Sequence, residues 1–165
     1  MYHKTRWTAQ KIAGRIELIT PLVHRRMAPL PPFAMLELPD PMTAPPIGDG
    51  VDRGGWTTID YNTHWGRRYM DFVLHTTFTV PAGWEADRAV ALYLPLGEAG
   101  DFSHPEALAY IDGAVHGTCD RHHQEFLLPA AARDGKPHQL DLHGWTGLID
   151  RSDFTTDPGL FMKAC

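Results

Sequence analysis

The chain has 165 residues and a net charge of −5, a length typical of one domain and a charge unsuited to a phosphate-binding surface, so we expect no nucleic acid partner. Its 15 glycines and 14 prolines indicate many turns, and with 5 Trp, 5 Tyr and 7 Phe they favour β structure over a helix bundle. A hydrophobic fraction of 43% supports a packed core, while no apolar run approaches the roughly 18 residues that cross a bilayer, so we expect no membrane contact.

The N-terminus carries no targeting signal. Residues 1–15 are polar and basic, without an apolar stretch or a small-residue cleavage site, so a cytoplasmic chain is predicted. Two cysteines, Cys119 and Cys165, are too few for a disulfide framework and are interpreted as reduced thiols.

Residues 4–19 are predicted to form an amphipathic helix, because their apolar residues recur close to every 3.6 positions. These apolar positions, with two beyond the helix, are Trp7, Ile12, Ile16, Ile19, Leu22 and Val23. Pro21 cannot continue the helix, so Thr20 is expected to cap a second short turn that ends near residue 26. A helix of this length buries little by itself, so residues 1–27 must lie against something else.

Residues 28–55 form a proline-rich strap that begins Ala28-Pro-Leu-Pro-Pro-Phe33, where few places are left for strand pairing. An extended strap that wraps over a surface is preferred to a free tether, because several of its apolar side chains require burial. They are Leu30, Phe33, Met35, Leu36 and Leu38.

Residues 56–165 show short apolar runs at regular spacing with no helical pattern between them. Strands are predicted over 69–80, 89–96 (as a central strand), 107–111, 114–117, 126–128 and 138–143. Asp112-Gly113 between two apolar runs predicts a type I′ hairpin, because both central residues need a positive φ. The expected fold is mainly β, a jelly-roll or galactose-binding-like β-sandwich preceded by the helix and the strap.

The last residues begin another apolar run, Leu160-Phe161-Met162, three residues before the chain stops. We favour a sandwich that is cut short at its C-terminal end over a strand that pairs at a sheet edge and ends there.

Ten histidines prompt a search for a metal site, and the densest cluster lies in the loop at 116–123. Its candidate ligands are His116, Cys119, Asp120, His122 and His123. Neither His-x-His nor His-Glu-x-x-His occurs, so a polar loop is preferred and no metal site is assigned, with a structural cation as the alternative. The pairs Asp120/His122 and Asp141/His143 would each share one face of a strand.

Signals for catalysis are weak. The chain has no Gly-x-Ser-x-Gly and no phosphate-binding glycine loop, its two serines lie in expected loops, and Cys119 is expected to pack as a small apolar side chain. The acids Glu98, Asp101 and Glu106 are interpreted as solvated loop residues, although a glycosidase needs two such carboxylates about 5–10 Å apart. No catalytic residue is therefore assigned.

Aromatic side chains could form a platform for sugar, because the CH face of a pyranose stacks on an indole ring. The candidates are Trp56, Tyr61, Trp65, Trp84 and Trp145. Of these, Trp65 in the turn-rich His64-Trp65-Gly66 and Trp145 are retained with His64 as predicted carbohydrate-binding residues; packing in the core is the alternative for each.

The order of several segments resembles the N-terminal, non-catalytic β-sandwich domain of glycoside hydrolase family 38 α-mannosidases of the cytosolic and bacterial branch. The segments are Ile19-Thr-Pro-Leu-Val-His-Arg-Arg26, Trp56 with Tyr61-Asn-Thr-His-Trp-Gly66, Phe78-Thr-Val-Pro-Ala-Gly-Trp84, Val90-Ala-Leu-Tyr-Leu94 and Glu106-Ala-Leu-Ala-Tyr-Ile-Asp-Gly-Ala-Val-His-Gly117. The resemblance covers most of residues 4–145.

The resemblance implies a parent enzyme that hydrolyses α-mannosides with zinc held in a following catalytic domain, which opens with Gly-His-x-Asp. No His-x-Asp occurs in this chain, so no catalytic residue or cofactor is transferred to it, and the chain alone is expected to be inactive. The implied partner is the catalytic domain of the same polypeptide, with a homo-oligomer and a mannoside glycan as further candidates.

Two alternatives stay open. A free-standing carbohydrate-binding module would bind mannosides through His64, Trp65 and Trp145. A small metalloenzyme of the cupin type is disfavoured, because the required His-x-His with a Glu ligand is missing.

Overall fold

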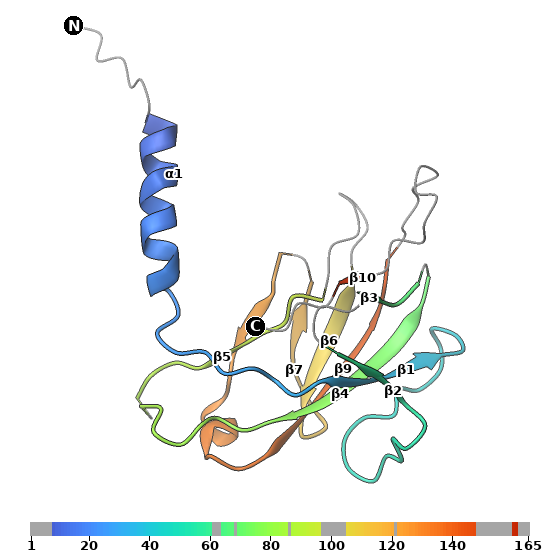
Figure 1. The fold of residues 1–165 in the computed structure, drawn as a ribbon. Helices are drawn as coiled ribbons and strands as arrows, with labels where there is room; N and C mark the ends of the chain where they lie inside the picture. The colour runs from blue at the N-terminus through green and yellow to red at the C-terminus, as the bar shows by residue number, and fades with distance from the viewer. Residues whose placement is uncertain are drawn as a thin grey trace, which may run out of the picture.

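The computed structural model describes the backbone of 160–161 and, with most of their side chains, residues 8–60, 64–67, 69–85, 87–96, 105–120 and 122–147 (Figure 1). Within these residues the chain is mainly β, with ten strands in antiparallel sheets, one α-helix and two 3-10 helices. None of the described helices is long and apolar enough to span a bilayer.

Helix α1, Thr8–Ile19, confirms the predicted helix over these residues, and the predicted start at 4–7 lies outside the described residues. The 3-10 helix η1, Thr20–Leu22, follows it directly. The predicted cap at Thr20 is wrong. Its hydroxyl donates to the carbonyl of Ile16 at 2.8 Å, the i−4 bond of a residue still in the helix, and Ile19 occupies the N-cap position with no side-chain bond.

The main sheet has six strands in the order β2-β1-β4-β9-β6-β7, each pair antiparallel. Their bounds are β2 Thr57–Ile59, β1 Phe33–Leu38, β4 Asp71–Phe78, β9 His138–Trp145, β6 Glu106–Ile111 and β7 Ala114–Cys119. Two small sheets accompany it. One pairs β5, Ala91–Tyr93, with β8, Glu125–Leu127, and the other pairs β3, His64–Trp65, with β10, Leu160–Phe161.

Strand β1 corrects the description of 28–55 as a strap without strand pairing. Its six residues contain no proline and lie between Pro32 and Pro39, so every backbone amide within the strand remains available. It pairs with β2 on one side and β4 on the other. Phe33 and Leu38 are buried, as their apolar character required.

The run 89–96 also differs from expectation. It contributes the three-residue strand β5 to a two-stranded sheet rather than a central strand. Its apolar residues alternate, because Val90, Leu92, Leu94 and Leu96 are buried while Ala91 and Tyr93 between them are exposed. That alternation is typical of a strand with one covered face.

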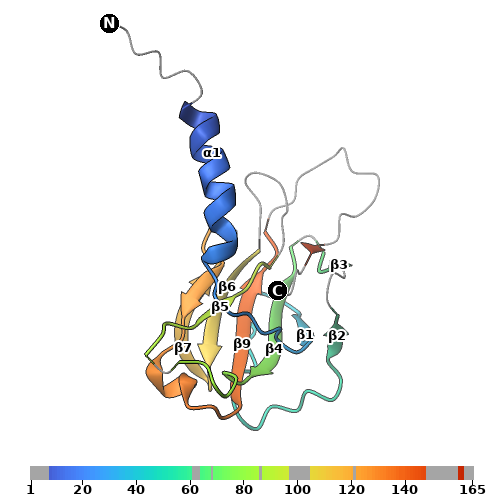
Figure 2. The same cartoon turned by 60° about the vertical axis from the view of Figure 1, so that its left-hand side comes forward.

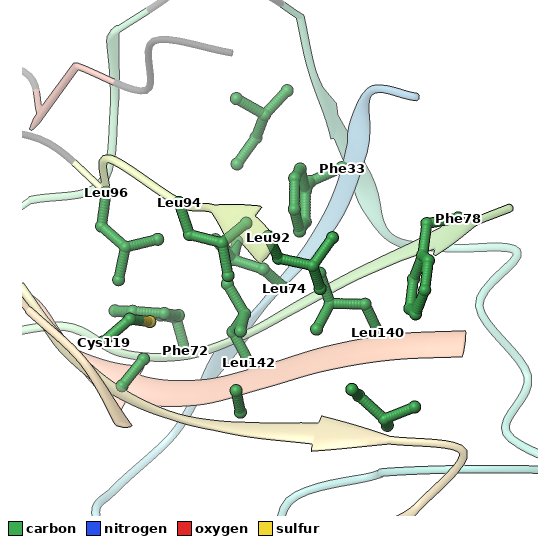
Figure 3. Close-up of a cluster of buried hydrophobic side chains, with 14 of the residues drawn as sticks. Phe33, Phe72, Leu74, Phe78, Leu92, Leu94, Leu96, Cys119, Leu140 and Leu142 are labelled. Carbon is green, nitrogen blue, oxygen red and sulfur yellow. The ribbon is translucent and has the colours of Figure 1, made fainter. Parts of the chain in front are cut away.

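The hydrophobic core lies between β5 and one face of the main sheet (Figure 3). Phe72, Leu74, Leu140 and Leu142 point from the central strands β4 and β9 toward Leu92 of β5 and the leucines that follow it. Fully burying a leucine or phenylalanine contributes about 1.5–3 kcal/mol, so this layer contact supplies much of the stability.

The predicted hairpin of β6 and β7 is confirmed. Asp112 has φ 50° and Gly113 has φ 78°, as a type I′ turn requires. The predicted strands at 69–80, 126–128 and 138–143 are confirmed as β4, β8 and β9 with small shifts of their ends.

The second part of the strap crosses the face of the main sheet that lies opposite the core. It leaves the end of β1 at Leu38, and Gly48 then donates its amide to Asp141 of β9 at 2.9 Å. Gly48 also packs against Gly113 in the β6–β7 turn. The strap therefore passes over β4, so its second part wraps a surface as predicted, whereas most of the apolar residues behind that prediction form β1.

Candidate functional site: the outer face of the main sheet

The outer face of the main sheet is the face opposite the core, and strand register places its side chains in rows. Residues 72, 74, 140 and 142 point into the core, so their odd-numbered neighbours on β4 and β9 point outward. One row is Leu38, Asp71, Trp145 and Glu106; the next is Leu36, Val73, His143 and Leu108; a third is Ala34, His75, Asp141 and Tyr110.

The first row places an indole between two carboxylates. Trp145 is 36% exposed, its cross-strand neighbours are Asp71 and Glu106, and its Nε1 donates to Glu106 Oε2 at 3.4 Å. Adjacent strands lie about 4.8 Å apart, so the backbones that carry the two carboxylates are about 10 Å apart. An aromatic ring with an acid on each side can bind a sugar by stacking and hydrogen bonding, or bind a cation.

The second and third rows extend this surface with partly exposed apolar and aromatic side chains. Leu108, Tyr110 and His143 are half-buried, and Val115, which pairs with Tyr110 across β6 and β7, is 64% exposed. The open part of the outer face thus consists of Trp145, Asp71, Glu106, Leu108, Tyr110, Val115 and His143.

The other part of the outer face is closed by a buried polar cluster around Asp141. This carboxylate is fully buried and accepts the Gly48 amide at 2.9 Å, Arg53 at 3.2 Å and His75 Nδ1 at 2.7 Å. The Arg53 guanidinium also lies 5.6 Å from the centre of the Trp56 ring. These contacts fix the strap to β9 and occupy Trp56, so this cluster has a structural role.

The three predicted carbohydrate-binding residues do not form one site. Trp65 is only 4% exposed and stands edge-on to Phe72 of the core, with ring centres 4.9 Å apart. Trp145 lies on the outer face of the main sheet, opposite the face from which Phe72 points. The side chain of His64 lies outside the described residues, and its backbone pairs with 161.

The loop at 116–123 is held by its own polar groups where the structure describes it. Asp120 accepts the amides of His122 and His123 at 2.6 and 2.7 Å and His123 Nδ1 at 3.0 Å. Burial opposes ionisation of Asp120, but the bonds from His123 and His122 hold its pKa below the usual value. Within the described residues no three His, Cys, Asp or Glu side chains come together to hold a metal ion.

Cys119 packs in the core as predicted. It is fully buried, and burial, reinforced by the charge of Asp120, raises the pKa of its thiol to about 12. A thiol with that pKa supplies almost no thiolate at neutral pH, so Cys119 is no nucleophile.

The other candidates for catalysis are dispersed. Glu106 lies on β6 beside Trp145, whereas Glu98, Asp101 and both serines lie outside the described residues. Asp141 and His143 share one face of β9, as their spacing predicted, but the imidazole that bonds Asp141 is His75.

A groove of ≈ 260 Å³ lies on the core side, between the start of the strap, the end of β4 and β5. Most of its lining side chains are apolar, among them Leu30, Phe78, Val80, Trp84, Leu92 and Leu128. The polar side-chain groups in the described lining are the hydroxyls of Thr77 and Thr79 and the indole of Trp84, and none of them is a carboxylate, an imidazole or a thiol.

The sequence interpretation missed Asp71, Tyr110 and His143 as neighbours of Trp145. Alternation along each strand could have placed them on the same face as other outward residues. Their alignment in rows depends on which strands pair, and this information is not local.

Comparison of the chain with known protein families, curated proteins and solved structures finds no match.

Proposed function

We propose that this chain is the N-terminal accessory domain of a family 38 α-mannosidase, non-catalytic by itself, with a β-sandwich of the jelly-roll or galactose-binding-like type. The segments that resemble this family, in the same order along the chain, support the proposal. The main sheet, with the β5–β8 pair packed over its core face, is consistent with it. In this proposal the domain is cytoplasmic, and zinc and the reacting carboxylates belong to a catalytic domain of the same polypeptide.

The observation that carries an assembly role is the uncovered apolar surface of the helical segment. Helix α1 buries no residue, and large apolar side chains remain 53–76% exposed along it and just beyond it. They are Ile12, Ile16, Leu18, Ile19, Leu22, Val23 and Met27. Contiguous apolar surface of this kind marks a protein interface, so the segment is suited to pack on a catalytic domain or on another subunit.

The decisive experiment is to read the coding sequence downstream of the codon for Cys165. An open frame that runs on for several hundred codons and contains Gly-His-x-Asp is expected, and the resulting polypeptide should hydrolyse aryl α-mannosides in a zinc-dependent way. A stop codon directly after Cys165 would overturn the accessory-domain proposal.

A free-standing carbohydrate-binding module is the second candidate, and the row of Asp71, Trp145 and Glu106 favours it. Titration calorimetry with mannose oligosaccharides should then show saturable heat that Trp145→Ala abolishes. Trp84→Ala is the matched control, because Trp84 lines the apolar groove on the core side. Absence of heat with the unchanged chain would eliminate this candidate.

A further inference from the structure

The segment that follows α1 and η1 is attached to the sheets by its basic residues. His24 pairs with Glu125 at 3.1 Å, Arg26 donates to the Gly83 carbonyl at 2.6 Å, and Arg25 pairs with Glu85 at 3.5 Å. These contacts attach the base of α1 to β8 and to the turn after β4. From this base the helix extends away from the sheets in both views (Figures 1 and 2).

The exposed surface of α1 combines an apolar stripe with basic side chains. Ile12, Ile16 and Ile19 recur at the i, i+4, i+7 spacing of one helix face and are 53%, 53% and 56% exposed. Lys11 and Arg15 form a second i, i+4 pair directly beside this stripe. The helix therefore presents a surface suited to a partner with both apolar and acidic groups.

The rest of the chain has the opposite charge. Residues 1–27 contain six Lys or Arg and one Glu, a net charge of +5, whereas 28–165 contain nine Lys or Arg and 19 Asp or Glu, a net charge of −10. The N-terminal segment is thus a basic arm on an acidic body.

This charge distribution discriminates between three partners for α1. Two arms packed against each other would bring like charges together. An anionic membrane would attract the arm but repel a body of charge −10. A second copy also repels the body, but its acidic body attracts the arm, and an exchange of arms makes two such attractions at once.

On the second copy, the open part of the outer face carries acidic and apolar groups that complement the basic and apolar side chains of α1. Asp71 and Glu106 lie on either side of Trp145, so Lys11 and Arg15 can pair with carboxylates and stack on the indole. Leu108 and Val115 offer apolar contact to the isoleucine stripe. Helix on sheet is also a common packing layer in proteins.

We propose that α1 docks on the open outer face of a second copy of this chain, so that two copies exchange their arms in a symmetric dimer. Such an exchange creates two identical contacts and buries twice the surface of a single docking event. This proposal rests on the assembly role proposed above and names its partner.

The first test is sedimentation velocity of the full chain at about 50 mM and about 500 mM salt, because surface ion pairs are screened at high salt. A dimer at low salt that weakens at high salt is expected. Lys11→Glu/Arg15→Glu and Glu106→Lys should each weaken the dimer at least about tenfold, the effect of about 1.4 kcal/mol. Asp87→Lys, which makes the same charge change at an exposed position away from the outer face, should dimerise normally.

A mixing experiment then tests the exchange itself. The chain with Lys11→Glu/Arg15→Glu keeps an intact outer face, and the chain with Glu106→Lys keeps an intact arm. Each should dimerise weakly alone, but their mixture should dimerise more tightly, because one contact is unchanged and the other sets the acidic variant arm against a lysine in place of Glu106. Both variants should retain the circular dichroism of the unchanged chain, because α1 buries nothing and Glu106 is exposed, although Glu106→Lys also removes the acceptor of Trp145 Nε1.

Three outcomes would overturn this proposal. They are a monomer at every salt concentration, a dimer that survives both variants, and binding to anionic phospholipid vesicles by a chain that stays monomeric. None of these outcomes depends on the DNA sequence beyond the codon for Cys165. A failure of the dimer proposal can therefore be told apart from a failure of the mannosidase proposal.

Discussion

Asp141 is the only fully buried carboxylate among the described residues, and its partners are Gly48 and Arg53 of the strap and His75 of β4. We expect Asp141→Ala to lower the free energy of unfolding by about 3 kcal/mol, because it leaves Arg53 and His75 enclosed without their anion. Urea denaturation measures this change. Asp40→Ala, at an exposed turn carboxylate, should cost less than about 1 kcal/mol, and equal effects of the two variants would contradict a special role for Asp141.

His138 joins two carboxylates and gives stability a dependence on pH. Its Nδ1 lies 2.7 Å from Asp112 and its Nε2 lies 3.0 Å from Asp134, so both ring nitrogens donate when it is protonated. The bond to Asp112, opposed by burial and aided by Asp134, raises the pKa of His138. Its stabilising contribution is therefore complete below about pH 6.5 and is lost as the pH rises through the raised pKa.

The carboxylates set the acid limit of the same cluster. Hydrogen bonds from the Lys136 amide and then from His138 lower the pKa of Asp134 to about 2. For Asp112, burial opposes ionisation but is outweighed by the bonds from His138 and Gln139, so its pKa is lowered. Their contribution is present above about pH 3.8 and is lost as the pH falls.

We therefore expect the difference in unfolding free energy between the unchanged chain and His138→Gln to be largest between about pH 4 and pH 6.5 and to shrink above that range. Guanidinium denaturation across pH 4–9 measures it. Asp112→Asn should remove part of the same dependence, and a difference that grows above pH 8 would contradict the assigned sign.

At the scale of elements, the pairing of β9 with β6 requires a glycine. A Cβ on Gly144 would lie 2.8 Å from the Cα of Ala107 and would also overlap the carbonyl oxygen of Glu106. Gly144→Ala should therefore separate the two strands and cost at least about 2 kcal/mol in chemical denaturation. Gly55→Ala, where a Cβ meets nothing within 4 Å, is the control and should change stability by less than about 1 kcal/mol.

At this scale the sequence correctly predicted the features that local chemistry determines. Asp112-Gly113 specifies its turn because two adjacent residues adopt a positive φ, and the period of 12–19 indicates a helix without reference to any partner. Strand β1 was missed because flanking prolines concealed six residues that can pair. The run 89–96 was placed at the centre of a sheet because a buried apolar run does not reveal how many strands pair beside it.

The candidate site shows the same limit. Trp145 was retained as a candidate for stacking on sugar, and the structure leaves it 36% exposed. Its neighbours Asp71 and Glu106 are 74 and 39 positions away in the chain and meet it only through strand pairing. Trp65, chosen by its turn-rich surroundings, packs instead on Phe72, a contact that depends on the tertiary arrangement.

At the scale of the whole molecule, α1 and the sheets should differ in stability. The sheet body has a shared core, whereas α1 has 12 residues and buries none of them, and isolated helices of that length are marginal in water. At high salt, amides of α1 should exchange with deuterium almost unprotected while those of β4 and β9 exchange most slowly. At low salt and high protein concentration, docking on a second copy should protect α1 as well. Exchange followed by mass spectrometry under both conditions separates the two contributions, and strong protection of α1 in a dilute monomer would show that the helix packs on its own body.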